Sequence, residues 1–176
     1  MAQAHLIDFN ESDRADYMAV VASMAGADGN VSSEEILALR ELCRHFVLGP
    51  AARGRVMAAT TPGSEDLDAA LDRLAGTGLQ HALTLDLCAM AWRDGQLVEE
   101  EAAEIRRLAT RLGLDVPQVG ALVFLASAVL QGGDLEAPFA ELEKAGVPRS
   151  ALALSATLYG MSQAGQGAAR EALQAL

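Results

Sequence analysis

The hydrophobic positions of this chain recur with the period of an α-helix. Tyr17, Val20, Val21 and Met24 have the i, i+3, i+4, i+7 spacing that places apolar side chains on one helix face. Gly, Pro and Ser residues interrupt the pattern and mark the ends of its segments. The pattern predicts helices over residues 13–25, 51–59, 65–75, 79–91, 99–112 and 149–161, and further helices from Ser32 or Ser33 to Gly49, from about Pro117, and after Gly132-Gly133.

The composition favours helix over sheet along the whole chain. Hydrophobic residues make up 51% of the 176 positions but aromatic residues only 4%, so the core must consist mainly of Ala, Leu, Val and Met. Ala and Leu lose little side-chain freedom in a helix, and alternating runs of β-branched residues are scarce. We therefore expect an all-α, single-domain helical bundle of about eight to ten helices, spanning residues 1–176.

One stretch of the sequence occurs twice. Segment 24–36 returns 66 residues later as segment 90–102, and in both copies an Asp-Gly pair is followed by a Glu seven residues after the Asp. A second echo, from Leu67-Asp68-Ala69 to Leu135-Glu136-Ala137, has a shift of 68 residues. Repetition at a fixed interval indicates duplicated supersecondary units. We expect an internal duplication of a four-helix unit, with repeats in 13–78 and 79–146, and a truncated, degenerate third unit in 147–176.

The repeated Asp-Gly and Glu residues fit either a cation site or the start of a helix. Their spacing matches the second half of an EF-hand calcium loop, but the first half lacks carboxylates, and calcium needs six or more oxygen ligands. Ser32 and Glu35 also have the spacing of a capping box, which the second copy loses because Val98 replaces the Ser. Both interpretations stay open. The candidate ligands for a divalent cation are Asp28, Glu35, Asp94 and Glu101.

The charge of the chain restricts its partners. The formal net charge of −11 and the pI near 4.6 repel phosphate backbones, which argues against nucleic-acid binding. The same charge suits attraction of cations or of a basic protein partner. The apolar stretches are too short to span a bilayer and the start of the chain lacks a signal pattern. We therefore expect a cytoplasmic protein without direct membrane insertion.

The other reactive side chains form no catalytic pattern. Cys43 and Cys88 lie inside predicted helices and are expected in the core. The histidines are scattered and lack zinc-ligand spacing: His5, His45 and His81. A metal-assisted hydrolase would need more ligands than the sequence offers, so we expect no enzyme. Trp92, the only Trp, is expected to pack in the core or at a hinge, with an exposed partner contact as the alternative.

The two copies of the motif resemble a known signature. The phrases Ala27-Asp28-Gly29-Asn30-Val31-Ser32-Ser33-Glu34-Glu35 and Arg93-Asp94-Gly95-Gln96-Leu97-Val98-Glu99-Glu100-Glu101 are similar to the duplicated signature of the tellurite-resistance TerB family. The same module resembles the N-terminal region of a DnaJ-like membrane co-chaperone. The resemblance covers residues 13–130 well and the remainder loosely. It departs at the C-terminal end, where Ala164 and Gly165-Gln166-Gly167 leave a degenerate unit.

The resemblance implies an all-helical bundle with pseudo-symmetric halves. It also implies a cytoplasmic, non-catalytic accessory protein of a bacterial stress-resistance system, with a protein partner in a membrane-associated stress-resistance complex. Carried over residue by residue, the acidic signature falls on Asp28, Glu35, Asp94 and Glu101, which become candidate contacts for cations or protein partners. The alternative function is a divalent-cation sensor or buffer.

Overall fold

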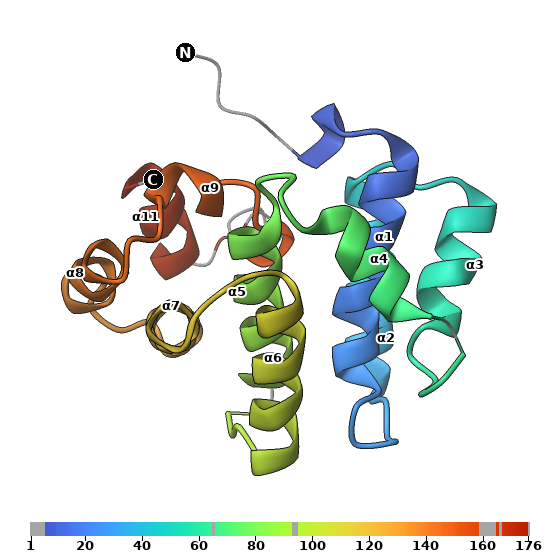
Figure 1. Ribbon diagram of the computed structural model, residues 1–176, viewed down its shortest axis with the longest axis horizontal. Coiled ribbons are helices and arrows are strands. Elements are labelled where there is room, and N and C mark those ends of the chain that lie inside the picture. Colours follow the sequence, from blue (N-terminus) through green and yellow to red (C-terminus); the bar gives the residue numbers. More distant parts are fainter. Residues whose placement is uncertain (1–5, 65, 93–94, 159–164, 166, 176) are drawn as a thin grey trace.

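The computed structural model describes residues 6–64, 66–92, 95–158, 165 and 167–175, and every regular element among them is a helix (Figure 1). The first half contains η1 (Leu6–Asp8), α1 (Glu11–Ala25), α2 (Ser33–His45), α3 (Pro50–Ala58) and α4 (Leu67–Leu74). The second half contains α5 (Gln80–Ala91), α6 (Glu99–Arg111), α7 (Val116–Gln131), α8 (Glu136–Lys144), α9 (Arg149–Leu152) and α11 (Gly167–Ala175). The all-α prediction is confirmed.

Helices α1 and α5 form the centre of the bundle. Residues 15–22 of α1 and 82–91 of α5 are buried on all faces, and a helix without an exposed stripe must lie inside the fold. Helix α1 contacts α3, α4 and α5, while α5 contacts α6, α7 and α9 (Figure 1). The structure therefore places the two helices that precede the Asp-Gly motifs side by side.

The outer helices are amphipathic and begin at the expected caps. Helix α2 buries Leu39, Leu42 and Cys43 and exposes most of its other side chains. Helix α4 begins at Leu67 because the Asp66 side chain accepts a hydrogen bond from the Asp68 N–H at 3.1 Å. Glu65, where the sequence placed this start, lies outside the described residues. None of the described helices combines the length and the apolar character needed to cross a bilayer.

Two helices paired by the sequence echo start with the same local contact. Asp66 accepts from the N–H two residues later in α4, and Asp134 accepts from the Glu136 N–H at 3.4 Å before α8. The two aspartates are 68 residues apart, which is the shift of the echo. The division of the chain into two repeats and a third unit stays a prediction.

The predicted helix over 149–161 is wrong as a continuous element. Helix α9 ends at Leu152, and the chain turns before residues 156–158 become helical again. The cause is Asp86 of α5, whose carboxylate accepts hydrogen bonds from the Ser155 hydroxyl and from the backbone N–H groups of Ala156 at 2.8 Å and Thr157 at 3.1 Å. A buried carboxylate thus caps a new helical turn where the hydrophobic pattern alone favours continuation.

Both cysteines are core residues, as expected. Cys43 is 1% exposed and Cys88 is 0% exposed, and both thiols are free. Burial raises the pKa of Cys43 to about 11 and that of Cys88 to about 12. Since the thiolate is the reactive form, neither side chain is suited to redox or nucleophilic chemistry at neutral pH.

Candidate binding site

The two Asp-Gly turns have the same backbone geometry. Gly29 has φ of 83° and Gly95 has φ of 84°, a region that favours glycine. Each glycine N–H donates to the carbonyl three residues earlier, Gly26 at 3.0 Å and Trp92 at 2.9 Å. The aliphatic residues that follow, Val31 and Leu97, pack against the core. The sequence therefore identified the turns and their apolar anchors correctly.

The turn after α1 lies against the loop that follows α3. A Cβ atom on Gly26 would be 1.7 Å from the Thr60 carbonyl oxygen, so only glycine allows this approach. The second copy has Trp92 at the corresponding position, at the C-terminal end of α5, where it is partly buried. The first turn is thus fixed by backbone contact, and the second carries a large side chain instead.

The candidate carboxylates bond to the backbone around these turns. Asp28 accepts from the Asn30 N–H at 2.8 Å, which closes the turn. Glu35 accepts from the Ser32 N–H at 2.8 Å while the Ser32 hydroxyl accepts from the Glu35 N–H at 3.1 Å, so the predicted capping box is present. In the second copy Glu101 accepts from the Val98 N–H at 3.2 Å. Each carboxylate is therefore held in place at the mouth of its helix.

The structure brings the carboxylates of both copies to one cavity. We call this cavity of about 510 Å³ the motif hollow; it is lined by Ala25, Asp28, Asn30, Val31, Ser32, Glu34, Glu35, Met90, Ala91 and Glu101. Four of these side chains are carboxylates and none is cationic, while Val31 and Met90 add apolar surface. Asp94, the fourth candidate residue, lies outside the described residues.

Histidine does not join the motif hollow. His81 stands at the first turn of α5 and the motif follows the last turn, about 15 Å away along the helix axis at 1.5 Å per residue. His45 lies at the end of α2, 3.6 Å from Glu41. His5 is outside the described residues. Within the described ranges, no three His, Cys, Asp or Glu side chains converge closely enough to hold a metal ion.

Comparison with known protein families decides the identity. Residues 14–122 match the family described as tellurite resistance protein TerB. The chain belongs to this family. The match runs from α1 into α7 and includes both Asp-Gly turns, so the motif hollow lies within the TerB-family region. Comparisons with curated proteins and with solved structures give no match.

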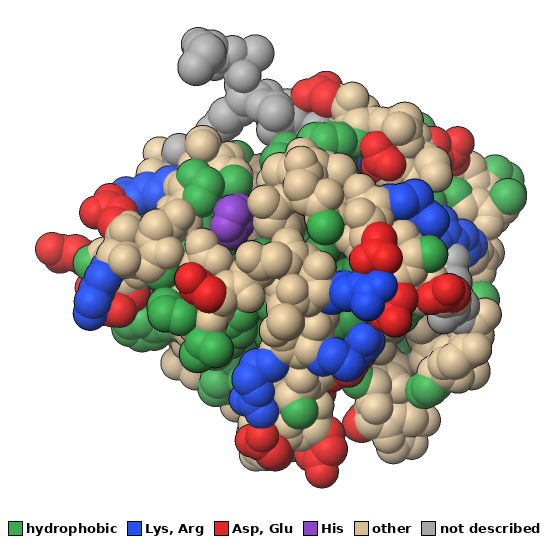
Figure 2. Space-filling model, in the orientation of Figure 1, with side chains coloured by type: hydrophobic (Ala, Val, Ile, Leu, Met, Phe, Trp, Pro, Cys, Tyr) green, Lys and Arg blue, Asp and Glu red, His purple; other side chains and the backbone are tan. Residues whose placement is uncertain are grey.

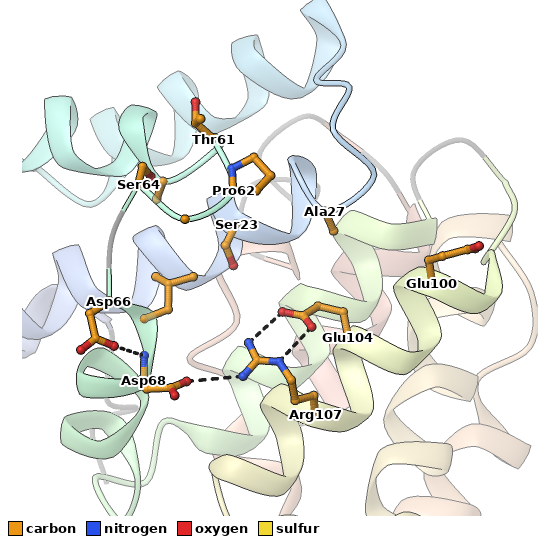
Figure 3. Close-up of a pocket in the computed structure, with 13 residues that line it drawn as sticks. Ser23, Ala27, Thr61, Pro62, Ser64, Asp66, Asp68, Glu100, Glu104 and Arg107 are labelled. Carbon is orange, nitrogen blue, oxygen red and sulfur yellow. Dashed lines mark hydrogen bonds and ion pairs between the residues drawn. The ribbon is translucent and has the colours of Figure 1, made fainter.

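A second acidic cavity of this TerB-family chain lies beside α4 and α6 (Figure 3). It measures about 480 Å³, and its charged side chains are Asp66, Asp68, Glu100, Glu104 and Arg107. Arg107 lies between Glu104 at 2.9 Å and Asp68 at 3.4 Å, and these hydrogen bonds raise its pKa, that to Glu104 most. Glu100 faces this cavity and Glu101 the motif hollow, so the first turn of α6 separates the two cavities.

Charged groups on this side of the TerB-family bundle are arranged in two ways. Acidic side chains gather at the lower edge of the face in Figure 2, where the turn before α6 lies in Figure 1. Between α4 and α6, by contrast, Arg107 and Arg111 pair with Asp68 and Asp72. The uncompensated negative charge is therefore concentrated at the repeated motifs.

Sequence reasoning missed two buried aspartates that hold these helices together. Asp16 of α1 is 0% exposed and pairs with Arg55 of α3 and Arg73 of α4, each at 2.7 Å. Asp86 of α5 is also 0% exposed and accepts from the Tyr17 hydroxyl of α1. The available signal was an Asp inside an apolar helical run, since a buried carboxylate requires partners.

Proposed function

We propose that this TerB-family chain is a cytoplasmic, non-catalytic accessory protein whose motif hollow binds a cationic segment of a protein partner. One observation carries the proposal: four carboxylates from the two repeated motifs line one cavity without a cationic side chain. The partner would belong to a membrane-associated stress-resistance complex of the kind that the family implies. The alternative function is a divalent-cation sensor or buffer.

The surroundings of the hollow suit a Lys or Arg side chain. Glu35 and Glu101 are each fixed by a bond to a backbone N–H, so they lose little freedom when they bind a ligand. Val31, Met90 and Ala91 provide apolar surface for the methylene groups of a basic side chain. The net charge of −11 would also attract a basic segment over several ångströms in dilute salt.

A metal ion fits the described geometry less well than a basic side chain. Calcium takes six to eight oxygen ligands, whereas Asp28, Glu35 and Glu101 each use a carboxylate oxygen to accept a backbone hydrogen bond. Among the described residues no group of three ligating side chains converges. A guanidinium group needs only two well-placed carboxylate oxygens, because it donates from a planar fork.

Calorimetric titration of chelator-stripped protein separates the candidates. One series uses a short Lys/Arg peptide, and another uses Ca²⁺, Mn²⁺ and Zn²⁺. The proposal predicts saturable, salt-sensitive peptide binding that weakens about tenfold or more in the Glu35→Gln, Glu101→Gln double variant. Gln keeps the capping hydrogen bond and removes only the charge. Glu141→Gln, on the exposed surface of α8, is the control and should bind normally.

Each other outcome has a definite meaning. Saturable metal binding that is lost in the same double variant would replace the proposal with the cation-sensor function. Peptide binding that the double variant leaves unchanged, or no binding in either series, would overturn a role of the motif hollow in ligand binding. The four carboxylates would then serve only the turns and helix starts.

A further inference from the structure

A second groove of different character lies between α2 and α3. It has a volume of about 580 Å³ and is lined by Leu37, Arg40, Glu41, Cys43, Arg44, Pro50, Arg53, Gly54 and Met57. Three of the nine side chains are arginines and one is a glutamate, so the groove is basic in a chain with a net charge of −11. We call it the basic groove.

Two of its arginines have no internal partner. Arg44 bonds Glu41 at 2.7 Å, but Arg40 and Arg53 make no ion pair or side-chain hydrogen bond with any described residue. Elsewhere on the surface Arg106, Arg107, Arg111 and Arg149 each pair with a carboxylate. In so acidic a chain, two unpaired guanidinium groups on facing helices are available to an external carboxylate.

Apolar surface lies between these charges. Leu37 is 63% exposed, which leaves most of a large aliphatic side chain in water beside Arg40. Met57 is partly buried on the facing helix and packs against the core, and Cys43 forms buried surface below. Met is flexible and adapts its shape to a bound side chain. The groove thus combines an apolar strip with guanidinium groups on both sides.

We propose that the basic groove docks an acidic amphipathic helix of a partner protein. A helix with apolar residues at every third or fourth position would place them on Leu37 and Met57, as in helix-in-groove recognition. Glutamates flanking that apolar stripe would reach Arg40 on one side and Arg53 on the other. The net negative charge of the chain disfavours nucleic acid and anionic membranes, and the hollow shape suits a helix better than a flat bilayer.

This docking is independent of the motif hollow. The basic groove uses residues 37–57, whereas the motif hollow uses the residues around both Asp-Gly turns, and the two cavities share no lining residue. An acidic ligand in one and a basic ligand in the other would let the chain join two partners. A failure of either proposal leaves the other unaffected, because different variants and probes test them.

Fluorescence anisotropy with designed peptides tests the proposal. The probe is a labelled helical peptide with leucines at every third or fourth position and glutamates on both flanks. Two companion peptides replace the glutamates with lysines or the leucines with alanines. We expect saturable binding of the acidic leucine peptide, and at least tenfold weaker binding of both companions. High salt should weaken the binding of the acidic peptide.

Methionine methyl NMR locates the bound peptide within the protein. The Met57 methyl signal should shift during the titration, since Met57 lines the groove. Met18, Met24 and Met90 are 0%, 2% and 3% exposed in the core and serve as internal references whose signals should stay in place. A peptide that binds without moving the Met57 signal would place the contact elsewhere and overturn the proposal.

Charge reversal in the groove provides the matched variants. Arg40→Glu with Arg53→Glu should weaken the acidic peptide at least tenfold, and Leu37→Ser should weaken it several-fold. All three side chains are exposed, so the variants should fold, as circular dichroism can verify. Lys144→Glu on α8 makes the same change of charge away from the groove and should bind normally. Absence of binding to the unmodified protein, or equal binding by the groove variants, would overturn the proposal.

Discussion

Asp16 and Asp86 are both fully buried, yet their surroundings favour opposite charge states. Burial raises the pKa of Asp16, but hydrogen bonds from Arg73 and Arg55 outweigh it and hold the pKa below its ordinary value. The pKa of Asp86 is raised by burial, because its partners are neutral hydroxyl and N–H donors that compensate only in part. Asp16 thus contributes stability as an anion, while the anionic form of Asp86 is costly.

Replacement of Asp16 by Asn should destabilise the protein in a pH-dependent way. Loss of the charge-assisted hydrogen bonds should cost about 2 kcal/mol near pH 7. A carboxyl group with a lowered folded-state pKa stabilises above its unfolded pKa of about 4, and this contribution disappears as pH falls through the folded pKa. Urea unfolding at several pH values should therefore show the two proteins converging in acid. A difference independent of pH would contradict the assigned ionic role.

Gly26 should tolerate no side chain. In Gly26→Ala the new Cβ would meet the Thr60 carbonyl oxygen at 1.7 Å, so the turn after α1 and the loop after α3 must separate. We expect a loss of about 3 kcal/mol in urea unfolding. Gly120→Ala is the control, because Gly120 lies within α7 and a Cβ there meets nothing within 4 Å. That variant should gain up to about 1 kcal/mol, and similar stabilities for both variants would refute the close approach.

At the level of elements, α2 and α6 begin alike but have unequal caps. Ser32 gives α2 a reciprocal capping box, whereas Val98 has no side-chain acceptor and α6 keeps only the bond from the Val98 N–H to Glu101. Val98 is 41% exposed, so a polar residue fits there. Val98→Ser should stabilise the protein by about 0.5–1 kcal/mol, and Ser32→Val should destabilise it by a similar amount. Thermal unfolding measures both, and the same sign for the two changes would contradict this account.

Local signals in the sequence were sufficient for most elements and for the turns. Ser32 and Glu35, Gly29, and Pro117 near the start of α7 act on residues within a few positions, so their effect can be read from spacing. The interruption after α9 could not be read in this way, because its cause, Asp86, is 69 residues from Ser155 in the sequence. Hydrophobic periodicity does not record a polar partner that arrives from another helix.

The candidate site was predictable only in its parts. Spacing identified Asp28, Glu35 and Glu101 as equivalent positions, but their common cavity depends on how α1 and α5 pack. The basic groove depends in the same way on the packing of α2 against α3, and its arginines form no motif in the sequence. Binding surfaces assembled from several helices need the three-dimensional arrangement before they can be recognised.

The molecule as a whole extends its core beyond the family-matched region. The TerB match ends at residue 122, yet Leu152, Leu154 and Leu158 are at most 8% exposed and belong to the same hydrophobic core. Asp86 adds polar contacts to residues 155–157. The C-terminal part therefore completes the core around α5 and is not an appendage to a finished domain.

Removal of residues 147–176 should abolish cooperative folding. The truncated chain would expose the apolar surfaces that those three leucines cover and leave Asp86 without its donors from Ser155, Ala156 and Thr157. Burial of three leucines alone is worth about 5 kcal/mol or more, comparable with the whole stability of many domains. Calorimetric and circular-dichroism melts should show no sharp transition. A truncated chain that melts like the full protein would show that the TerB region folds independently.

A point variant tests the same dependence without truncation. Asp86→Ala leaves the Tyr17 and Ser155 hydroxyls and two backbone N–H groups without their acceptor, so it should cost about 3 kcal/mol or more. Tyr17→Phe removes only one of these donors and should cost about 1 kcal/mol. Because the folded-state pKa of Asp86 is raised, wild-type stability should fall as pH rises from its unfolded to its folded pKa, a slope that Asp86→Ala lacks. Amide exchange at Ala156 and Thr157 should accelerate in Asp86→Ala; unchanged exchange there would mean that packing alone holds the C-terminal part in place.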